Sequence, residues 1–186
     1  MYMKEKRSLA QNKMIYALIN DIVKHFCNDF EATHKRSFRN DVETVKRTLK
    51  VGFAQESGLK PDFSTAKLSK DQATEFISYI IEFCFQFDVP LSRPGIEMTA
   101  DINRYLFLCI KYRKCAVTGA PGEIHHVNAI GMGRNRNYYD HTQSKLICLC
   151  RIKHMEAEQI GWETFRNKYH VEGINLSAAA VREFHI

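Results

Sequence analysis

The sequence has no long hydrophobic run, no internal repeat and no low-complexity segment. It contains no stretch of about 18 apolar residues, so we expect no membrane-spanning helix. Residues 1–7 are charged and hold no apolar stretch, so we expect no secretory signal. Hydrophobic residues make up 45% and aromatic residues 11% of the chain, which is enough for a packed core. A length of 186 residues suits one domain or two small ones.

The sequence also lacks the cysteine pattern of a disulfide framework. Three of its six cysteines lie within predicted helices among apolar neighbours, as buried free thiols do. A reducing, cytoplasmic setting is the simplest interpretation. The six are Cys27, Cys84, Cys109, Cys115, Cys148 and Cys150.

The first half of the chain has the apolar spacing of helices. Between Met14 and Phe26 apolar residues recur every three or four positions, which predicts an amphipathic helix. A second helix is expected after Asn40, broken at Gly52 and again at residues 58–61. These patterns favour a mostly helical N-terminal region.

Further helix boundaries follow from capping and breaking residues. Ser69 and Gln72 have the spacing of a capping box, which predicts the start of a third helix. The Pro- and Gly-containing run at residues 89–95 predicts a stop and a linker. Thr99 is the expected N-cap of a fourth helix that extends through Cys109.

The second half changes to short apolar segments separated by turn residues. We expect strands at residues 124–127 and 146–149, joined by a basic loop at 131–137 and followed by a helix. The predicted fold class is α+β. A mostly helical domain at residues 1–95 would precede a ββα domain with a closing helix at residues 96–186.

The positive charge of the chain is concentrated in one segment. The sequence holds 27 Lys and Arg against 21 Asp and Glu, a net charge of +6. Residues 111–154 contain eight basic and two acidic residues, which accounts for the whole surplus. This segment would attract a polyanion such as DNA, and an ordinary solvated surface is the alternative.

Histidines stand in this basic segment in a pattern typical of a metal site. His125 and His126 are neighbours on a predicted strand, so their side chains point to opposite faces. One imidazole can then hold a metal while the other faces a different partner. His154 begins the following helix, and Glu158 lies four residues later on the same face. The layout indicates a compact nuclease centre, although Glu158 could also be a solvated surface carboxylate.

Residues 115–169 resemble the HNH endonuclease superfamily, and phage-encoded members in particular. The resemblance is carried by Ile-His-His-Val, a Gly-Met-Gly-Arg loop, and Leu-Cys-Arg followed by His and Glu-Ala. It implies that His125 is the first metal ligand, His126 the general base and His154 a metal ligand at the helix start. Glu158 stands where many relatives place another histidine.

Two departures from the HNH pattern are visible. The position of the central Asn is Lys145, so the loop-bracing role of that Asn is unfilled or shifted, to Ser144 or His141. Many relatives also hold zinc with two Cys-x-x-Cys pairs, but here only one cysteine of each pair is present, which excludes a four-cysteine site at these positions. A structural role for His141 is the simpler interpretation. The alternative is a structural zinc site built from Cys115, Cys148, Cys150 and His141.

The N-terminal region resembles the phage NinB/Orf recombination mediators. This resemblance is carried by residues 7–14, by Leu-Ser-Lys at 68–70 and by Phe-Asp-Val-Pro at 87–90. It implies binding of single-stranded DNA near single-strand-binding protein, and by analogy a homodimer. An unrelated helical support domain is the alternative.

Together these patterns predict a metal-dependent DNA endonuclease of phage or prophage recombination that acts on single-stranded or branched DNA. His126 would activate water, and His125, His154 and Glu158 would hold Mg²⁺ or Mn²⁺, with Zn²⁺ as the alternative. A non-enzymatic DNA-binding recombination mediator with a structural metal site is the competing interpretation. The residues expected to hold DNA phosphates are Arg134, Arg136, Lys145 and Arg151.

Overall fold

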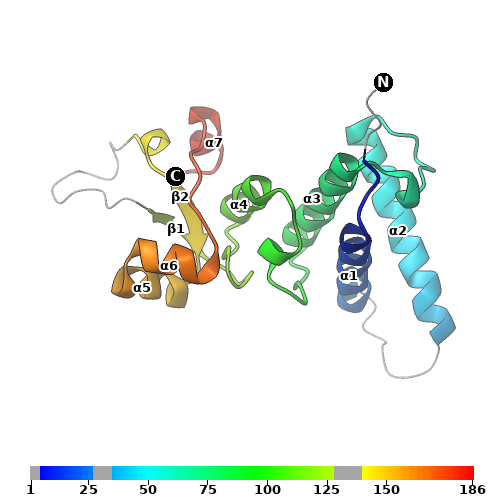
Figure 1. The fold of residues 1–186 in the computed structure, drawn as a ribbon, viewed down its shortest axis with the longest axis horizontal. Coiled ribbons are helices and arrows are strands. Elements are labelled where there is room, and N and C mark those ends of the chain that lie inside the picture. Colours follow the sequence, from blue (N-terminus) through cyan, green and yellow to red (C-terminus); the bar gives the residue numbers. More distant parts are fainter. Residues whose placement is uncertain (1–4, 27–34, 128–139) are drawn as a thin grey trace. The chain divides into compact units, whose positions relative to one another are not determined.

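The computed structural model describes residues 5–26, 35–127 and 140–186 (Figure 1). The chain is mixed and mostly helical with one small sheet, in agreement with the predicted α+β class. The helices are α1 (Leu9–Phe26), α2 (Lys35–Ser57), α3 (Lys70–Gln86), α4 (Ile102–Lys111), α5 (Arg151–Ile160), α6 (Trp162–Tyr169) and α7 (Ala178–Glu183). The strands are β1 (Glu123–His126) and β2 (Leu146–Leu149), and short 3₁₀ turns are η1 (Thr65–Lys67), η2 (Gly95–Glu97) and η4 (His141–Gln143).

The chain divides into two compact units. One consists of Met1–Arg93 with Met98–Asp101, and the other of Pro94–Glu97 with Ile102–Ile186. The assignment of residues 1–95 and 96–186 to domains with separate functions stays a prediction. Within the described parts of the chain, no helix combines the length and the apolar character that spanning a membrane requires.

The first unit is built from α1, α2 and α3, with α1 packed against both of the others. The apolar stripe of α1 faces that of α3, and these side chains are at most 2% exposed. Removing each such side chain from water contributes about 1.5–3 kcal/mol, so this stripe is the main source of stability in the unit. The stripe residues are Ile15, Leu18, Ile19 and Ile22 on α1, and Phe76, Ile77, Ile80 and Ile81 on α3.

Two capping boxes hold the starts of α1 and α3. The predicted box of Ser69 and Gln72 is confirmed, with both reciprocal hydrogen bonds present. A second box joins Ser8 and Gln11, whose backbone N–H groups donate to each other's side chains at 2.9 and 3.1 Å. The Gln11 side chain, 6% exposed, also donates to the carbonyl of Lys70 at 2.8 Å. Residues that carried the NinB/Orf resemblance therefore have local structural roles.

The prediction that Gly52 breaks α2 is wrong. The helix continues through Gly52 and ends at Ser57, before Gly58 with a φ of +71°. A Cβ atom on Gly52 would collide with the hydroxyl of Tyr79 on α3. Glycine is needed here for the close approach of a neighbouring helix, at the cost of helix propensity.

The prediction that Thr99 is the N-cap of α4 is also wrong. The helix begins three residues later, at Ile102. The Thr99 hydroxyl instead accepts a hydrogen bond from the backbone N–H of Asp101 at 3.0 Å. Threonine side chains often form such local turns, which compete with capping.

The second unit holds a two-stranded antiparallel sheet whose strands lie within one residue of the predicted ranges. His125 pairs with Ile147 and His126 with Leu146. All four residues of β2 are 0% exposed, whereas β1 is partly exposed. Leu146 also forms a bridge with Ile174, so β2 has backbone partners on both sides. The buried strand therefore provides a rigid support for the histidines of β1.

Candidate metal-dependent active site

The two histidines of β1 point to different surroundings. The ring of His125 lies 4.6 Å from the ring of His154 on α5, centroid to centroid, and stacks on Trp162 of α6 at 5.9 Å. The Nε2 atom of His126 lies 2.9 Å from Nδ1 of His141 in η4. Strand alternation accounts for this separation because neighbouring side chains leave a strand on opposite faces.

The side chain of His154 on α5 lies near residues of both β1 and α5. Its Nε2 atom lies 3.4 Å from a carboxylate oxygen of Glu158, one helical turn along α5. Its Nδ1 atom is buried without a hydrogen-bond partner and lies 3.7 Å from a carboxylate oxygen of Glu123. The structure thus brings His125, His154 and Glu158 together and adds Glu123, which sequence analysis missed. Glu123 stands two residues before His125, so strand alternation could have placed both on one face.

The chemistry of this donor set suits a divalent metal ion. Burial, together with the nearby His154, lowers the pKa of His125 to about 4, so its imidazole is neutral at physiological pH. A neutral imidazole has the lone pair that metal binding requires. The buried Nδ1 of His154 lies 3.7 Å from Glu123, beyond hydrogen-bond distance, and a shorter contact would give the histidine–carboxylate pairing that supports metal ligands. Among residues 5–26, 35–127 and 140–186, no three His, Cys, Asp or Glu side chains are arranged to hold an ion as they stand.

A family model described as "Putative HNHc nuclease" matches residues 3–181. The chain belongs to this HNHc nuclease family. No curated protein and no solved structure matches it. The match extends through both compact units, so placing the nuclease resemblance in the C-terminal half alone was too narrow. The comparisons do not support the resemblance of the N-terminal region to the NinB/Orf mediators.

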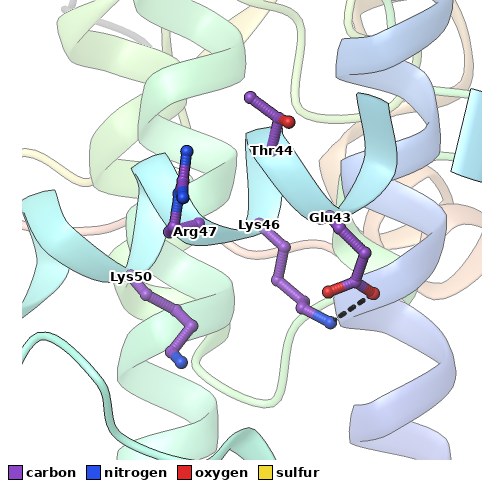
Figure 2. A pocket seen from close by; sticks show the side chains of 5 residues that line it. All are labelled: Glu43, Thr44, Lys46, Arg47 and Lys50. Atoms are coloured by element: carbon purple, nitrogen blue, oxygen red, sulfur yellow. Dashed lines mark hydrogen bonds and ion pairs between the residues drawn. The ribbon is translucent and has the colours of Figure 1, made fainter. Parts of the chain in front are cut away.

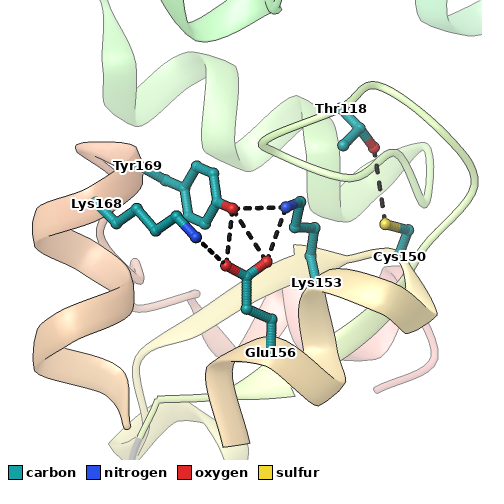
Figure 3. Close-up of polar contacts among 6 residues, drawn as sticks. All are labelled: Thr118, Cys150, Lys153, Glu156, Lys168 and Tyr169. Carbon is teal, nitrogen blue, oxygen red and sulfur yellow. Dashed lines mark hydrogen bonds and ion pairs between the residues drawn. The ribbon is translucent and has the colours of Figure 1, made fainter. Parts of the chain in front are cut away.

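Helix α5, which carries His154 and Glu158, is joined to α6 by a polar network (Figure 3). The carboxylate of Glu156 on α5 accepts hydrogen bonds from Lys153 at 2.8 Å, Lys168 at 2.6 Å and Tyr169 at 2.8 Å. The Lys153 ammonium also donates to the Tyr169 hydroxyl at 2.6 Å. The hydrogen bonds from Lys153, Lys168 and Tyr169 lower the pKa of Glu156 to about 2. The network fixes α5, with His154, against α6, with Trp162.

The basic residues predicted to contact DNA are only partly described. Arg134 and Arg136 lie outside the described residues. Arg151 is exposed at the first position of α5. The Lys145 ammonium, with its side chain 51% exposed, lies 3.8 Å from a carboxylate oxygen of Glu172. The Lys145 side chain therefore forms a surface ion pair with Glu172.

The alternative zinc site of Cys115, Cys148, Cys150 and His141 stays a prediction. Cys115 and Cys148 are buried, Cys150 is the N-cap residue of α5, and all three are free thiols. The Thr118 hydroxyl donates to the sulfur of Cys150 at 3.7 Å (Figure 3). Thus Thr118, at the position of a lost cysteine, still contacts the cysteine of the other pair. His141, the fourth expected ligand, contacts His126.

A second basic surface lies on α2 (Figure 2). Within two helical turns, Lys46, Arg47 and Lys50 line a shallow pocket of about 330 Å³ together with Glu43 and Thr44. The Lys46 ammonium pairs with Glu43 at 2.6 Å. That of Lys50 lies 5.0 Å from the ring centroid of Phe63. The net charge of long segments does not reveal this surface, because acidic residues nearby cancel the charge of a local basic cluster.

Proposed function

We propose that this HNHc nuclease is a metal-dependent DNA endonuclease in which His126 is the general base. His125, His154 and Glu158 hold the divalent ion. The observation that supports this assignment best is that the two histidines of β1 contact different residues. His125 contacts His154 on one face, while His126 contacts a different histidine, His141, on the other.

The hydrolysis then proceeds with defined roles for the side chains. His126 takes a proton from water through Nδ1, while Nε2 is engaged with His141. His125 presents a neutral nitrogen, His154 a second imidazole nitrogen and Glu158 a carboxylate oxygen, a mixed set that accepts Mg²⁺ or Mn²⁺, with Zn²⁺ as the alternative. When bound, the ion neutralises phosphate charge and stabilises the leaving oxygen. Trp162, stacked on His125, restricts the orientation of that ligand.

The substrate assignment rests on the basic residues. Lys145 and Arg151 lie between His126 and His154 along the chain, and Arg134 and Arg136 belong to the same basic segment. Lys46, Arg47 and Lys50 supply a second cationic surface on the first unit. Contacts of this kind bind the phosphate backbone without reading sequence. We extend the proposal to single-stranded or branched DNA in phage recombination, with single-strand-binding protein as a partner and a homodimer as the assembly.

One observation favours the competing function of a non-enzymatic mediator. Lys145, at the position of the usual Asn, pairs with Glu172 and leaves that loop-bracing role to another residue. A mediator would show salt-sensitive DNA binding without strand breaks.

The test is a nicking assay on single-stranded, duplex and branched DNA with Mn²⁺ or Mg²⁺. His126→Ala is expected to lower the cleavage rate by about 10²–10⁴-fold, the usual contribution of a general base. His25→Ala, in α1 of the other unit, is the matched control and should cleave at the wild-type rate. Cleavage by His126→Ala at the wild-type rate would remove His126 from its role. Absence of cleavage by the wild-type protein with either metal would favour the mediator.

A further inference from the structure

His141 lies against the proposed base, His126. The Nε2 atom of His126 and the Nδ1 atom of His141 are 2.9 Å apart, and the ring centroids are 5.1 Å apart at an interplanar angle of 45°. Two ring nitrogens at this distance share one proton, since a hydrogen bond needs one donor and one acceptor. The tautomers of the two imidazoles are therefore coupled.

The turn that carries His141 is itself braced. The carboxylate of Asp140 accepts hydrogen bonds from the backbone N–H of Thr142 at 3.1 Å and from its hydroxyl at 2.6 Å. The side chain of Asn175 donates to the carbonyl of Thr142 at 3.3 Å. The residue after the turn, Ser144, is 1% exposed and donates its backbone N–H to the carbonyl of His141 at 3.3 Å. A side chain on such a turn can hold a fixed position.

We infer that His141 is the positioning residue for His126. In this arrangement His126 donates its Nε2–H to Nδ1 of His141, which places the basic lone pair of His126 on Nδ1. His141 would then set both the tautomer and the ring orientation of the base, the role that a supporting acceptor has for a catalytic imidazole. The inference rests on the proposed function.

Two variants separate positioning from folding. His141→Leu removes the acceptor, whereas His141→Asn keeps an acceptor oxygen close to the place of Nδ1. We expect His141→Leu to lower kcat by about 10–100-fold, the range found for supporting residues. The KM for DNA and the affinity for Mn²⁺ should stay unchanged, because a positioning residue acts only through His126. His141→Asn should recover most of the lost kcat. Thermal unfolding of both variants shows whether they fold like the wild type.

Nitrogen NMR of the full chain gives a readout that does not depend on cleavage. The wild-type protein should show His126 as the Nε2–H tautomer, and His141→Leu should show a mixture of tautomers. A wild-type kcat for His141→Leu, or an equal loss in both variants with the His126 tautomer unchanged, would overturn the inference. Full activity of His126→Ala would show that the proposed function is wrong. The tautomer measurement would still report on the contact between His126 and His141, so the two failures can be distinguished.

Discussion

The buried Nδ1 of His154 is an unusual atom of the candidate site. It has no hydrogen-bond partner among the described residues, and leaving a buried polar atom unpaired costs about 1–3 kcal/mol. The nearest acidic group is the carboxylate of Glu123, at 3.7 Å. A protein can keep such an unpaired atom when a bound ligand or a small closing movement gives the atom a hydrogen-bond partner. On binding of a metal at the other side of the ring, Glu123 would accept the Nδ1–H and increase the basicity of His154.

This role predicts the effect of Glu123→Gln. We expect the substitution to weaken Mn²⁺ binding by about 10–100-fold, because the supporting carboxylate becomes a neutral amide. Isothermal titration of the full chain with Mn²⁺ measures the change. Glu163→Gln, which alters an exposed carboxylate on α6 paired with Arg166, is the control and should bind like the wild type. Equal affinities of Glu123→Gln and the wild type would show that Glu123 does not support the ligand.

At the scale of single residues, the sequence predicts only those positions that follow from a local rule such as strand alternation. The separation of His125 from His126 follows from strand alternation, and the position of His154 follows from the helix start. Glu123 obeys the same alternation rule and could have been found. The contact of His126 with His141 could not, because it joins residues 15 positions apart and no local periodicity pairs them. Only the folded chain brings the turn of His141 back to the strand.

At the scale of elements, a feature can be predicted from the sequence where its cause is local. The Ser69 and Gln72 box depends only on neighbours in the chain, and it is present as expected. The absence of a side chain at position 52 inside α2 is explained by Tyr79 in another helix, a contact that no local pattern reveals. The glycine inside α2 is therefore explained by tertiary packing, whereas the start of α3 is explained by neighbouring residues in the chain.

The cause assigned to Gly52 predicts a double-mutant cycle. Gly52→Ala should destabilise the wild-type protein by about 1–3 kcal/mol, because the new methyl group collides with the Tyr79 hydroxyl. In a Tyr79→Phe background the hydroxyl is absent, and the gain of about 0.8–1 kcal/mol in helix propensity should offset part or all of the cost. Urea unfolding of the four proteins measures the coupling. Identical effects of Gly52→Ala in both backgrounds would contradict the packing explanation.

At the scale of the whole molecule, the family match and the charge distribution both extend over more of the chain than the sequence patterns suggested. The HNHc nuclease match covers residues 3–181, whereas the motifs that carried the resemblance lie between residues 115 and 169. The cationic surface on α2 lies outside the basic segment at residues 111–154. Short motifs and segment charges predict where chemistry is concentrated, but not how far the supporting structure extends.

A contribution of α2 to DNA binding predicts a specific change in salt dependence. Replacing Arg47 and Lys50 with Gln should weaken binding to all DNA sequences alike, since phosphate contacts do not read bases. The slope of log affinity against log salt should decrease by about 0.7–0.9 for each lost phosphate contact. Fluorescence anisotropy over a salt series measures the slope. Lys60→Gln, an exposed cation of the same unit, is the control. A slope unchanged by the double substitution would exclude α2 from the DNA surface.

The most direct test of the proposed centre is the anomalous scattering of Mn²⁺ in a crystal of the wild-type protein. We predict an ion bound by His125, His154 and Glu158, with His126 outside its coordination sphere and in contact with His141. An ion that binds His126, or residues 125 and 154 that share no ion, would contradict it.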